Sequence, residues 1–515
     1  MTLRHTLVRC LAIALSIGAM ACSQADTFLN EDPTTPPDGG STIPIESPDA
    51  GSVEQADAGA LPKPDAQTPS SLPELSGAQY EIDGDVTYIT FDGGECANVV
   101  ATPTVSGDYV IFPIHAKTKS CDVPGTYNSG ALAYSPTTGK LYEIASGPQS
   151  EGVLLVQAKE NQIFWPYVNA ATAKETFRIL DSESFGSIAN GAGQIRASSD
   201  SSPLYLDGIY YFGTVNSPQP ICQGTTGSDY EKDCGAIFGV DPQGQVVRRL
   251  DVDKGFRNWI TASPVTDGTH IYTGGGAQSK GDTETEYLYG CSLLKLDKDL
   301  NIVASADPGD EGCRNLGKLK SAPAGEIALT KNGLWVQWLG PNEAGGIANI
   351  SLYDHDLNTL CNASINVGTD TTVAGFYQAP TVDKDGNAYI VTNGDSSGTN
   401  RHAQLYKVDQ KCNLTLLAEG EGQASVSPTL ADDKYVLFPV DGKLKIITMD
   451  GKEFKSYTLA STAKVSAGPI IHKGVIYVIA EDATITAINN SGIQGYGAAD
   501  WPRFRANNRG GATLK

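Results

Sequence analysis

From about residue 78 to its C-terminus, the chain alternates short apolar and aromatic runs with polar turns. The runs are rich in Val, Ile, Tyr and Phe, and the segments between them are rich in Gly, Asp and Asn. Residues of the first kind favour pleated strands, and those of the second kind favour tight turns. No apolar periodicity typical of an amphipathic helix is present. The pattern therefore predicts an all-β domain over residues 78–515.

Eight similar runs recur along this domain at intervals of 40–64 residues. They begin at Tyr109, Gln162, Ile209, His270, Leu334, Ala388, Tyr435 and Val475. A small residue followed by proline precedes seven of them, at Thr102-Pro103, Ser202-Pro203, Ser263-Pro264, Ala322-Pro323, Ala379-Pro380, Ser427-Pro428 and Gly468-Pro469. The unit near residue 155 has GVLLVQA in that place.

A second series of turns follows the runs and also has eight members. They read YSPTTGKL, LDSESFGS, VDPQGQVV, LDKDLNIV, YDHDLNTL, VDQKCNLT, MDGKEFKS and INNSGIQG. A repeat of this length with about four strands is typical of a propeller blade, because a blade buries its faces only against its neighbours. The sequence predicts an eight-bladed β-propeller, with seven blades as the alternative count. An array of β-sandwiches would not repeat one turn signature eight times.

The N-terminus carries an export signal. Arg4, His5 and Arg9 precede the apolar run LAIALSIGAMA, which is too short to span a bilayer permanently. The run ends in Ala19-Met20-Ala21-Cys22, which resembles the lipobox of bacterial lipoproteins, although Ala19 stands where leucine is usual. We expect cleavage after residue 21, lipidation of Cys22 and an outer-membrane anchor. The alternative is a soluble secreted protein with an unmodified Cys22.

Residues 22–77 are expected to form a disordered linker between this anchor and the propeller. The segment after Cys22 holds nine prolines, ten acidic residues and one lysine, Lys63. Such a composition buries too little apolar surface to offset the entropy of ordering. The whole chain has a net charge of −22, and loss of Arg4 and Arg9 with the signal makes it −24. This charge repels phosphate backbones, so we expect no nucleic-acid partner.

Eight cysteines remain after Cys10 and Cys22 are set aside. An even number in an exported chain predicts disulfides, although the sequence does not fix their connectivity. Pairing of nearest neighbours gives Cys96–Cys121, Cys222–Cys234, Cys291–Cys313 and Cys361–Cys412. No CxxC cluster of the kind that binds zinc is present, and the histidines lack metal-ligand spacing.

The repeat units resemble the pyrroloquinoline-quinone-like β-propeller repeats, with the form SP-x-x-x-DG-x-x-Y followed by L-x-x-x-D-x-x-G. The best matches are residues 201–245, 261–302 and 377–411. The segment Trp501-Pro502-Arg503-Phe504-Arg505 resembles the W-P-x-F-R element that often flanks such propellers. The resemblance covers roughly residues 98–515 and implies the fold. The superfamily includes quinoprotein dehydrogenases, an outer-membrane barrel-assembly scaffold and many surface lipoproteins.

A quinone-dependent enzyme of this superfamily implies adjacent cysteines and recurrent tryptophan motifs. This chain has no adjacent cysteines, and its five tryptophans do not recur at one blade position. We therefore expect no quinone, no other cofactor and no metal. Residues 383–387 lack the glutamate that completes a calcium loop, so we interpret them as a hairpin turn. Paired carboxylates are invisible in sequence, so the alternative remains a propeller enzyme that acts on carbohydrate or as a quinone-dependent dehydrogenase.

Several connections look long enough to carry a binding site. They are residues 115–129, 214–235, 276–290, 306–320, 340–348 and 394–403. In four-stranded blades these connections share one end of the ring, where a rigid scaffold usually presents its binding residues. The candidates are Tyr230, Asp282, Glu284, Tyr287, Trp338, Arg401 and His402. We expect a non-catalytic module for a protein or glycan partner that meets the membrane only through its lipid. A barrel-assembly scaffold is a further alternative.

Overall fold

The computed structural model divides the chain into two compact units, Met1–Ala66 and Gln67–Lys515. It describes residues 72–91, 97–98, 103–116, 129–147, 157–159, 161–166, 177–191, 195, 201–214, 236–251, 258–280, 287–306, 323–338, 347–366, 379–393, 402–421, 426–440, 442–461, 465 and 467–503. All of these residues belong to the second unit. They form strands and turns without a helix, so none of them forms a helix that could cross a membrane.

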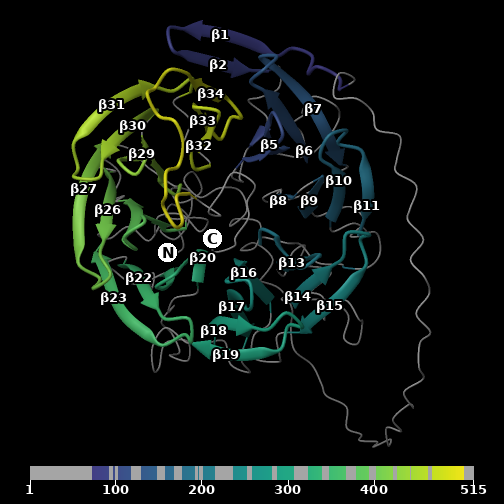
Figure 1. Cartoon of the computed structure of the whole chain (residues 1–515), viewed down its shortest axis with the longest axis vertical. Coiled ribbons are helices and arrows are strands. Elements are labelled where there is room, and N and C mark those ends of the chain that lie inside the picture. The colour runs from purple at the N-terminus through teal and green to yellow at the C-terminus, as the bar shows by residue number, and fades with distance from the viewer. Residues whose placement is uncertain are drawn as a thin grey trace, which may run out of the picture. The chain divides into compact units, whose positions relative to one another are not determined.

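Eight antiparallel sheets follow one another around a ring, which confirms the eight-bladed propeller (Figure 1). Blades 1 to 4 contain β3 (Ala97–Asn98), β4 (Thr104–Ser106), β5 (Tyr109–Ala116), β6 (Ser129–Ser135) and β7 (Lys140–Gly147); β8 (Gln157–Lys159), β9 (Gln162–Pro166), β10 (Phe177–Asp181) and β11 (Ser187–Asn190); β12 (Leu204–Leu206), β13 (Ile209–Gly213), β14 (Ala236–Val240) and β15 (Val246–Asp251); and β16 (Asn258–Thr266), β17 (Ile271–Lys280), β18 (Tyr287–Leu296) and β19 (Ile302–Ala306).

Blades 5 to 7 contain β20 (Pro323–Thr330), β21 (Gly333–Trp338), β22 (Ile347–Tyr353) and β23 (Thr359–Asn366); β24 (Thr381–Val382), β25 (Ala388–Asn393), β26 (His402–Val408) and β27 (Leu414–Glu421); and β28 (Thr429–Ala431), β29 (Tyr435–Val440), β30 (Lys443–Thr448) and β31 (Glu453–Thr458). The eight runs seen in the sequence are the second strands of the eight blades. Two of them begin one residue away from the expected position, at Ile271 and Gly333.

Blade 8 closes the ring with strands from both ends of the chain. It contains β32 (Ile470–His472), β33 (Val475–Ile479) and β34 (Ile485–Ile488) from the C-terminal part, and β1 (Gln79–Asp83) and β2 (Val86–Thr90) from the N-terminal part. β2 pairs with β34 as the fourth strand, and β1 adds a fifth. The eighth turn of the second series, INNSGIQG, therefore leads into no fourth strand of its own.

The turns that join first to second strands lie at the same end of the ring as the turns of the second series, which join third to fourth strands. We call this the turn end. The opposite end, where second strands lead to third strands and one blade leads to the next, is the loop end. In most blades the turn of the second series begins with an aspartate. The carboxylate of this aspartate accepts hydrogen bonds from backbone amides of the same turn. Asp297 accepts from Asp299 and Asn301 at 2.9 and 2.8 Å, and Asp354 repeats the pattern.

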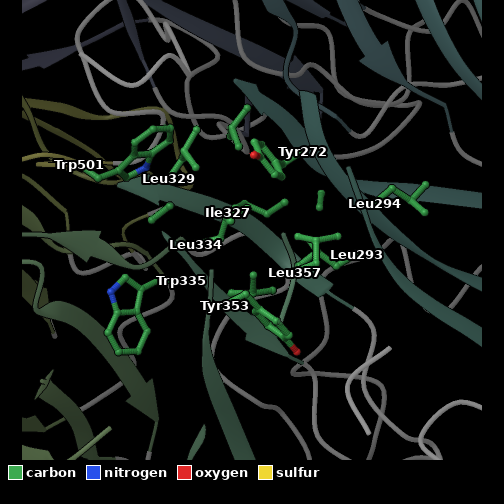
Figure 2. Packing of buried hydrophobic residues seen from close by; sticks show 14 of the residues in the cluster. Tyr272, Leu293, Leu294, Ile327, Leu329, Leu334, Trp335, Tyr353, Leu357 and Trp501 are labelled. Carbon is green, nitrogen blue, oxygen red and sulfur yellow. The ribbon is translucent and has the colours of Figure 1, made fainter. Parts of the chain in front are cut away.

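An aromatic residue in the second strand ties each of several blades to the next. The Tyr211 hydroxyl donates to the Lys298 carbonyl at 2.8 Å, and Tyr272 donates to the His355 carbonyl at 3.2 Å. In blade 5, Trp335 Nε1 donates to the Gly386 carbonyl at 3.1 Å. These groups come from the tyrosine position of the repeat. The rings of Tyr272 and Trp335 also pack in the apolar core between blades, in which Tyr353 of the third strand β22 is buried as well (Figure 2).

The small-Pro element of the repeat links neighbouring blades near the ring's centre. Ser263 Oγ in blade 4 accepts from the Ser202 amide at 2.6 Å, and Ser427 Oγ in blade 7 accepts from the Ala379 amide at 2.7 Å. In blade 8 the small residue is Gly468, where a Cβ would lie 3.0 Å from the Ser427 carbonyl oxygen. The residue before the proline is small because its hydroxyl forms a hydrogen bond between blades, as in Ser263 and Ser427, or because a backbone carbonyl lies close to it, as at Gly468.

Residues before position 78 also contact the propeller. Leu75 is buried between blades 8 and 1, and its amide donates to the Leu141 carbonyl at 2.8 Å. Leu72 packs against the cluster between blades 1 and 2. Residues 72–75, at the C-terminal end of the expected linker 22–77, thus contact the propeller, and residues 22–71 lie outside the described part of the chain. Burial of Leu75 and partial burial of Leu72 favour this contact.

Candidate functional site

The loop end of blades 4, 5 and 6 gathers three of the residues proposed from the sequence. Tyr287 is the first residue of β18, Trp338 is the last residue of β21, and His402 is the first residue of β26. Second strands end and third strands begin at the loop end, so all three positions lie there on consecutive blades. Tyr230, Asp282, Glu284 and Arg401 lie outside the described residues.

Blade 4 extends further at this end than its neighbours. β17 and β18 pair over ten residues, from Ile271↔Leu296 to Lys280↔Tyr287, whereas the second strands of blades 5 to 7 have six residues each. β16 accompanies them as far as the pairs Asn258↔Ala277 and Trp259↔Gly276. β19 pairs with β18 from Leu293 onward. The β17–β18 ribbon of blade 4, which β16 accompanies only as far as Ala277, therefore carries Tyr287 beyond the part of the blade that the ring needs.

The turn end carries most of the acidic groups described in the structure, and they have structural partners. Asp383 is buried and accepts from the amides of Asp385 and Asn387, both at 2.9 Å. It also accepts from the Tyr389 hydroxyl at 3.0 Å. The segment is a hairpin turn between β24 and β25, as interpreted from the sequence. Among the described residues, no group of three His, Cys, Asp or Glu side chains is arranged to hold a metal ion.

Hydrogen bonding explains the acidity of the turn aspartates. The side-chain amides of Asn301 and Asn413 donate to Asp297 and Asp409, each at 2.8 Å, and hold the pKa of each carboxyl below its usual value. Burial raises the pKa of the Tyr389 hydroxyl, and the neighbouring Asp383 carboxylate adds to this effect. At neutral pH the Asp297 and Asp409 carboxyls are therefore charged and the Tyr389 hydroxyl is neutral, as their roles in fixed turns require.

The C-terminal segment is held at the turn end and reaches the centre of the ring (Figure 1). Asp432 and Asp433, in the turn after β28, accept from the amides of Gly495 and Ala498 at 2.9 and 2.7 Å. Trp501 then pairs with Val382 of β24 through two backbone hydrogen bonds of 2.7 and 3.0 Å. Figure 2 shows its indole beside Leu329.

The next two residues reach two more blades. The Pro502 carbonyl accepts from the Leu430 amide of β28 at 2.7 Å. The Arg503 guanidinium, 1 % exposed, donates to the Pro103 carbonyl of blade 1 at 3.0 Å. Burial lowers the pKa of Arg503, and the Tyr496 hydroxyl beside it acts in the opposite direction. Residues 501–503 thus join the inner strands of blades 6, 7 and 1.

One disulfide joins described residues. Cys361 in β23 of blade 5 is bonded to Cys412 in the turn after β26 of blade 6. Cys412 has a φ of 61°, and its place in the turn matches Leu300 and Leu357, which also have positive φ and pack between blades. Cys291 lies in β18. Cys22, Cys96, Cys121, Cys222, Cys234 and Cys313 lie outside the described residues.

Sequence reasoning missed two features of the site. The path of Trp501–Arg503 across three blades was not expected, although the W-P-x-F-R element marked these residues as unusual. The left-handed leucines of the turns were also missed, because the sequence LDKDLN gives no sign that Leu300 is buried at 2 % exposure.

No family model and no curated protein matches the chain. Solved structures with a similar fold include BamB from Moraxella catarrhalis, which is 12% identical with a TM-score of 0.47 and covers 80% of this chain and 99% of its own. The computationally designed protein Ika8 is 14% identical with a TM-score of 0.49, covering 76% and 96%. Hydrazine synthase from Kuenenia stuttgartiensis is 9% identical with a TM-score of 0.42, covering 64% and 93%.

Proposed function

We propose that this protein is a cell-envelope lipoprotein, anchored through Cys22 in the outer membrane, whose propeller binds a protein or glycan partner at its loop end and performs no chemistry. The ribbon of blade 4 carries this proposal. The second and third strands of the other blades have four to eight residues, whereas β17 and β18 have ten each. The additional length serves no purpose in closing the ring.

The rest of the ring supports a binding role for the loop end. The turn end is occupied by short turns with internal hydrogen bonds and by the C-terminal segment that is held there. A binding residue on a rigid scaffold gains affinity because little ordering entropy is lost on association. The tail and the hydrogen bonds between blades make the propeller such a scaffold, and Tyr287, Trp338 and His402 lie at the end that it leaves available.

The test shortens the ribbon and asks whether the partner is lost. Ala277 and Gly290 are directly paired, so residues 278–289 can be replaced by Asn-Gly, the preferred two-residue hairpin turn. A photo-reactive side chain at Leu288 should cross-link a specific partner in intact cells, and one at Gln243 of the turn end should not. The shortened chain should lose this partner while its melting temperature stays unchanged.

Equal cross-linking from both positions, or unchanged partner recovery with the shortened ribbon, would contradict the proposed binding end. The anchor is tested separately. The intact mass of the mature chain should show acylation that Cys22→Ala abolishes, and an unmodified Cys22 would instead support the soluble secreted form.

A further inference from the structure

The outer strands of most blades expose apolar side chains near the turn end. Blades 2 to 7 all do so, blade 4 with two neighbouring residues, and the side chains are Ile188, Val247, Ile302, Val303, Leu360, Leu416 and Phe454, with exposed fractions of 38 to 53%. Each follows the turn that joins the third and fourth strands. The corresponding residue of blade 1 is Tyr142 in β7, and there the chain covers it with its own N-terminal segment.

Residues 72–75, Leu-Pro-Glu-Leu, show how a peptide covers such a position. Glu74 pairs with Tyr142 in an antiparallel bridge, and the Leu75 amide donates to the Leu141 carbonyl at 2.8 Å. The Glu74 carboxylate forms an ion pair of 2.6 Å with Lys140. Leu72 packs against the same cluster as Tyr109 and Tyr142, whose rings lie 6.0 Å apart. Backbone pairing, one leucine on an aromatic pair and one ion pair thus define the contact.

Blade 7 carries the same two kinds of group that contact residues 72–75 in blade 1, an aromatic pair and a lysine. Tyr435 begins β29 as Tyr109 begins β5, and its ring lies 4.8 Å from that of Phe454. Lys452 directly precedes β31, as Lys140 begins β7, and its side chain is 81% exposed in an ion pair of 3.2 Å with Asp450 of the same turn. Residues 434–458 contain five lysines and three acidic residues, although the whole chain has a net charge of −22. An acidic and apolar peptide therefore fits the charge of this blade.

We propose that Tyr435, Lys452 and Phe454 form a docking surface for an extended peptide of a partner protein, of the Leu-x-Glu-Leu type that residues 72–75 represent in blade 1. The peptide adds to the outer edge of β31, its leucine covers Phe454 and its glutamate pairs with Lys452. This surface lies at the rim beside the turn end. It is independent of the partner proposed for the loop end, and either proposal can fail alone.

The experiment uses the full mature chain and a fluorescent peptide with the sequence of residues 70–78, SSLPELSGA. Fluorescence anisotropy should show saturable binding that weakens as salt is added. Phe454→Ser and Lys452→Glu should each weaken binding about tenfold, as expected for truncation of a central contact. Leu360→Ser, which removes an equally exposed rim residue from blade 5, is the matched control and should leave binding unchanged. Equal melting temperatures of the three variants exclude misfolding.

A photo-reactive leucine at the peptide's first leucine position locates the contact. Cross-links to residues 434–458 support the proposal. Cross-links to residues 134–144 overturn it, because the probe would then replace the chain's own segment in blade 1. Absence of saturable binding, equal binding by Phe454→Ser and Leu360→Ser, or equal binding of a peptide carrying Glu74→Lys would overturn it as well.

Discussion

The two ends of the ring connect the strands in different ways. At the turn end, short turns are fixed by aspartates such as Asp297 and Asp354, and the C-terminal segment is held there. At the loop end, 22 residues separate β13 from β14, and the ribbon of blade 4 extends outward. The comparison teaches that short, internally bonded turns gather at one end, whereas the longer connections lie at the other, where a scaffold usually carries its binding residues.

The C-terminal segment provides the largest expected effect on this comparison. Trp501 is fully buried and bridges the blade interface beside Val382. Trp501→Ala should lower the free energy of unfolding by about 3–5 kcal/mol, the cost of deleting a buried tryptophan. Denaturant unfolding of the variant and the original chain measures this loss of free energy. A loss below about 1 kcal/mol would show that the tail is peripheral to closure of the turn end.

The disulfide between blades 5 and 6 comes next. The cross-linked residues are 51 apart, and removal of such a constraint costs about 2–4 kcal/mol in the unfolded-state entropy account. The double variant Cys361→Ala and Cys412→Ala should unfold at correspondingly lower denaturant concentration. Reduction should destabilise the original chain more than this double variant. Identical responses of the two proteins to reductant would contradict a stabilising role for this bond.

The aspartate turns are tested at Asp383. Its removal leaves the Tyr389 hydroxyl and two backbone amides without their acceptor, and should cost about 2–3 kcal/mol. Asp385→Ala in the same turn removes an equal charge and is the matched control. Thermal unfolding of the two variants should separate them clearly. A similar loss in both would assign the effect to charge rather than to the turn.

Acid should loosen the contact between blades 8 and 1. Burial raises the pKa of Asp108, but hydrogen bonds from Lys473, Ser135 and Thr137 outweigh it and hold the pKa at about 2. Because the folded pKa lies below the ordinary value of 3.8, this stabilisation is present above pH 4 and is lost as the pH falls through 2. The loss should be about 1–2 kcal/mol and absent in Asp108→Asn. A pH dependence shared by both proteins between pH 4 and 2 would contradict this assignment.

The smallest expected effect is at the loop end. Replacement of residues 278–289 by Asn-Gly should change the free energy of unfolding by less than about 0.5 kcal/mol, as for surface changes away from the core. Denaturant unfolding beside the Trp501→Ala variant sharpens the contrast between the two ends. A loss above 2 kcal/mol would mean that the ribbon stabilises the ring.

Much of the fold is readable in the sequence because each blade satisfies its local needs in the same way. The tyrosine and small-Pro positions recur because each blade must bond to the next, as Tyr211, Tyr272 and Ser263 do. The candidate site is less readable. Sequence placed Tyr287, Trp338 and His402 in long connections, but their assembly on consecutive blades follows from the order of the ring.

The sequence by itself determined the number of blades, the turns that bound their strands and the position of the repeat. These features depend on interactions between residues close in the chain, such as Asp354 with Asn358. Only the tertiary structure decided that β2 completes blade 8, that Leu72 and Leu75 cover blade 1 and that Arg503 reaches Pro103 across 400 residues. Such contacts join distant segments once the ring brings them together, and no local pattern encodes which segment will fill a given edge.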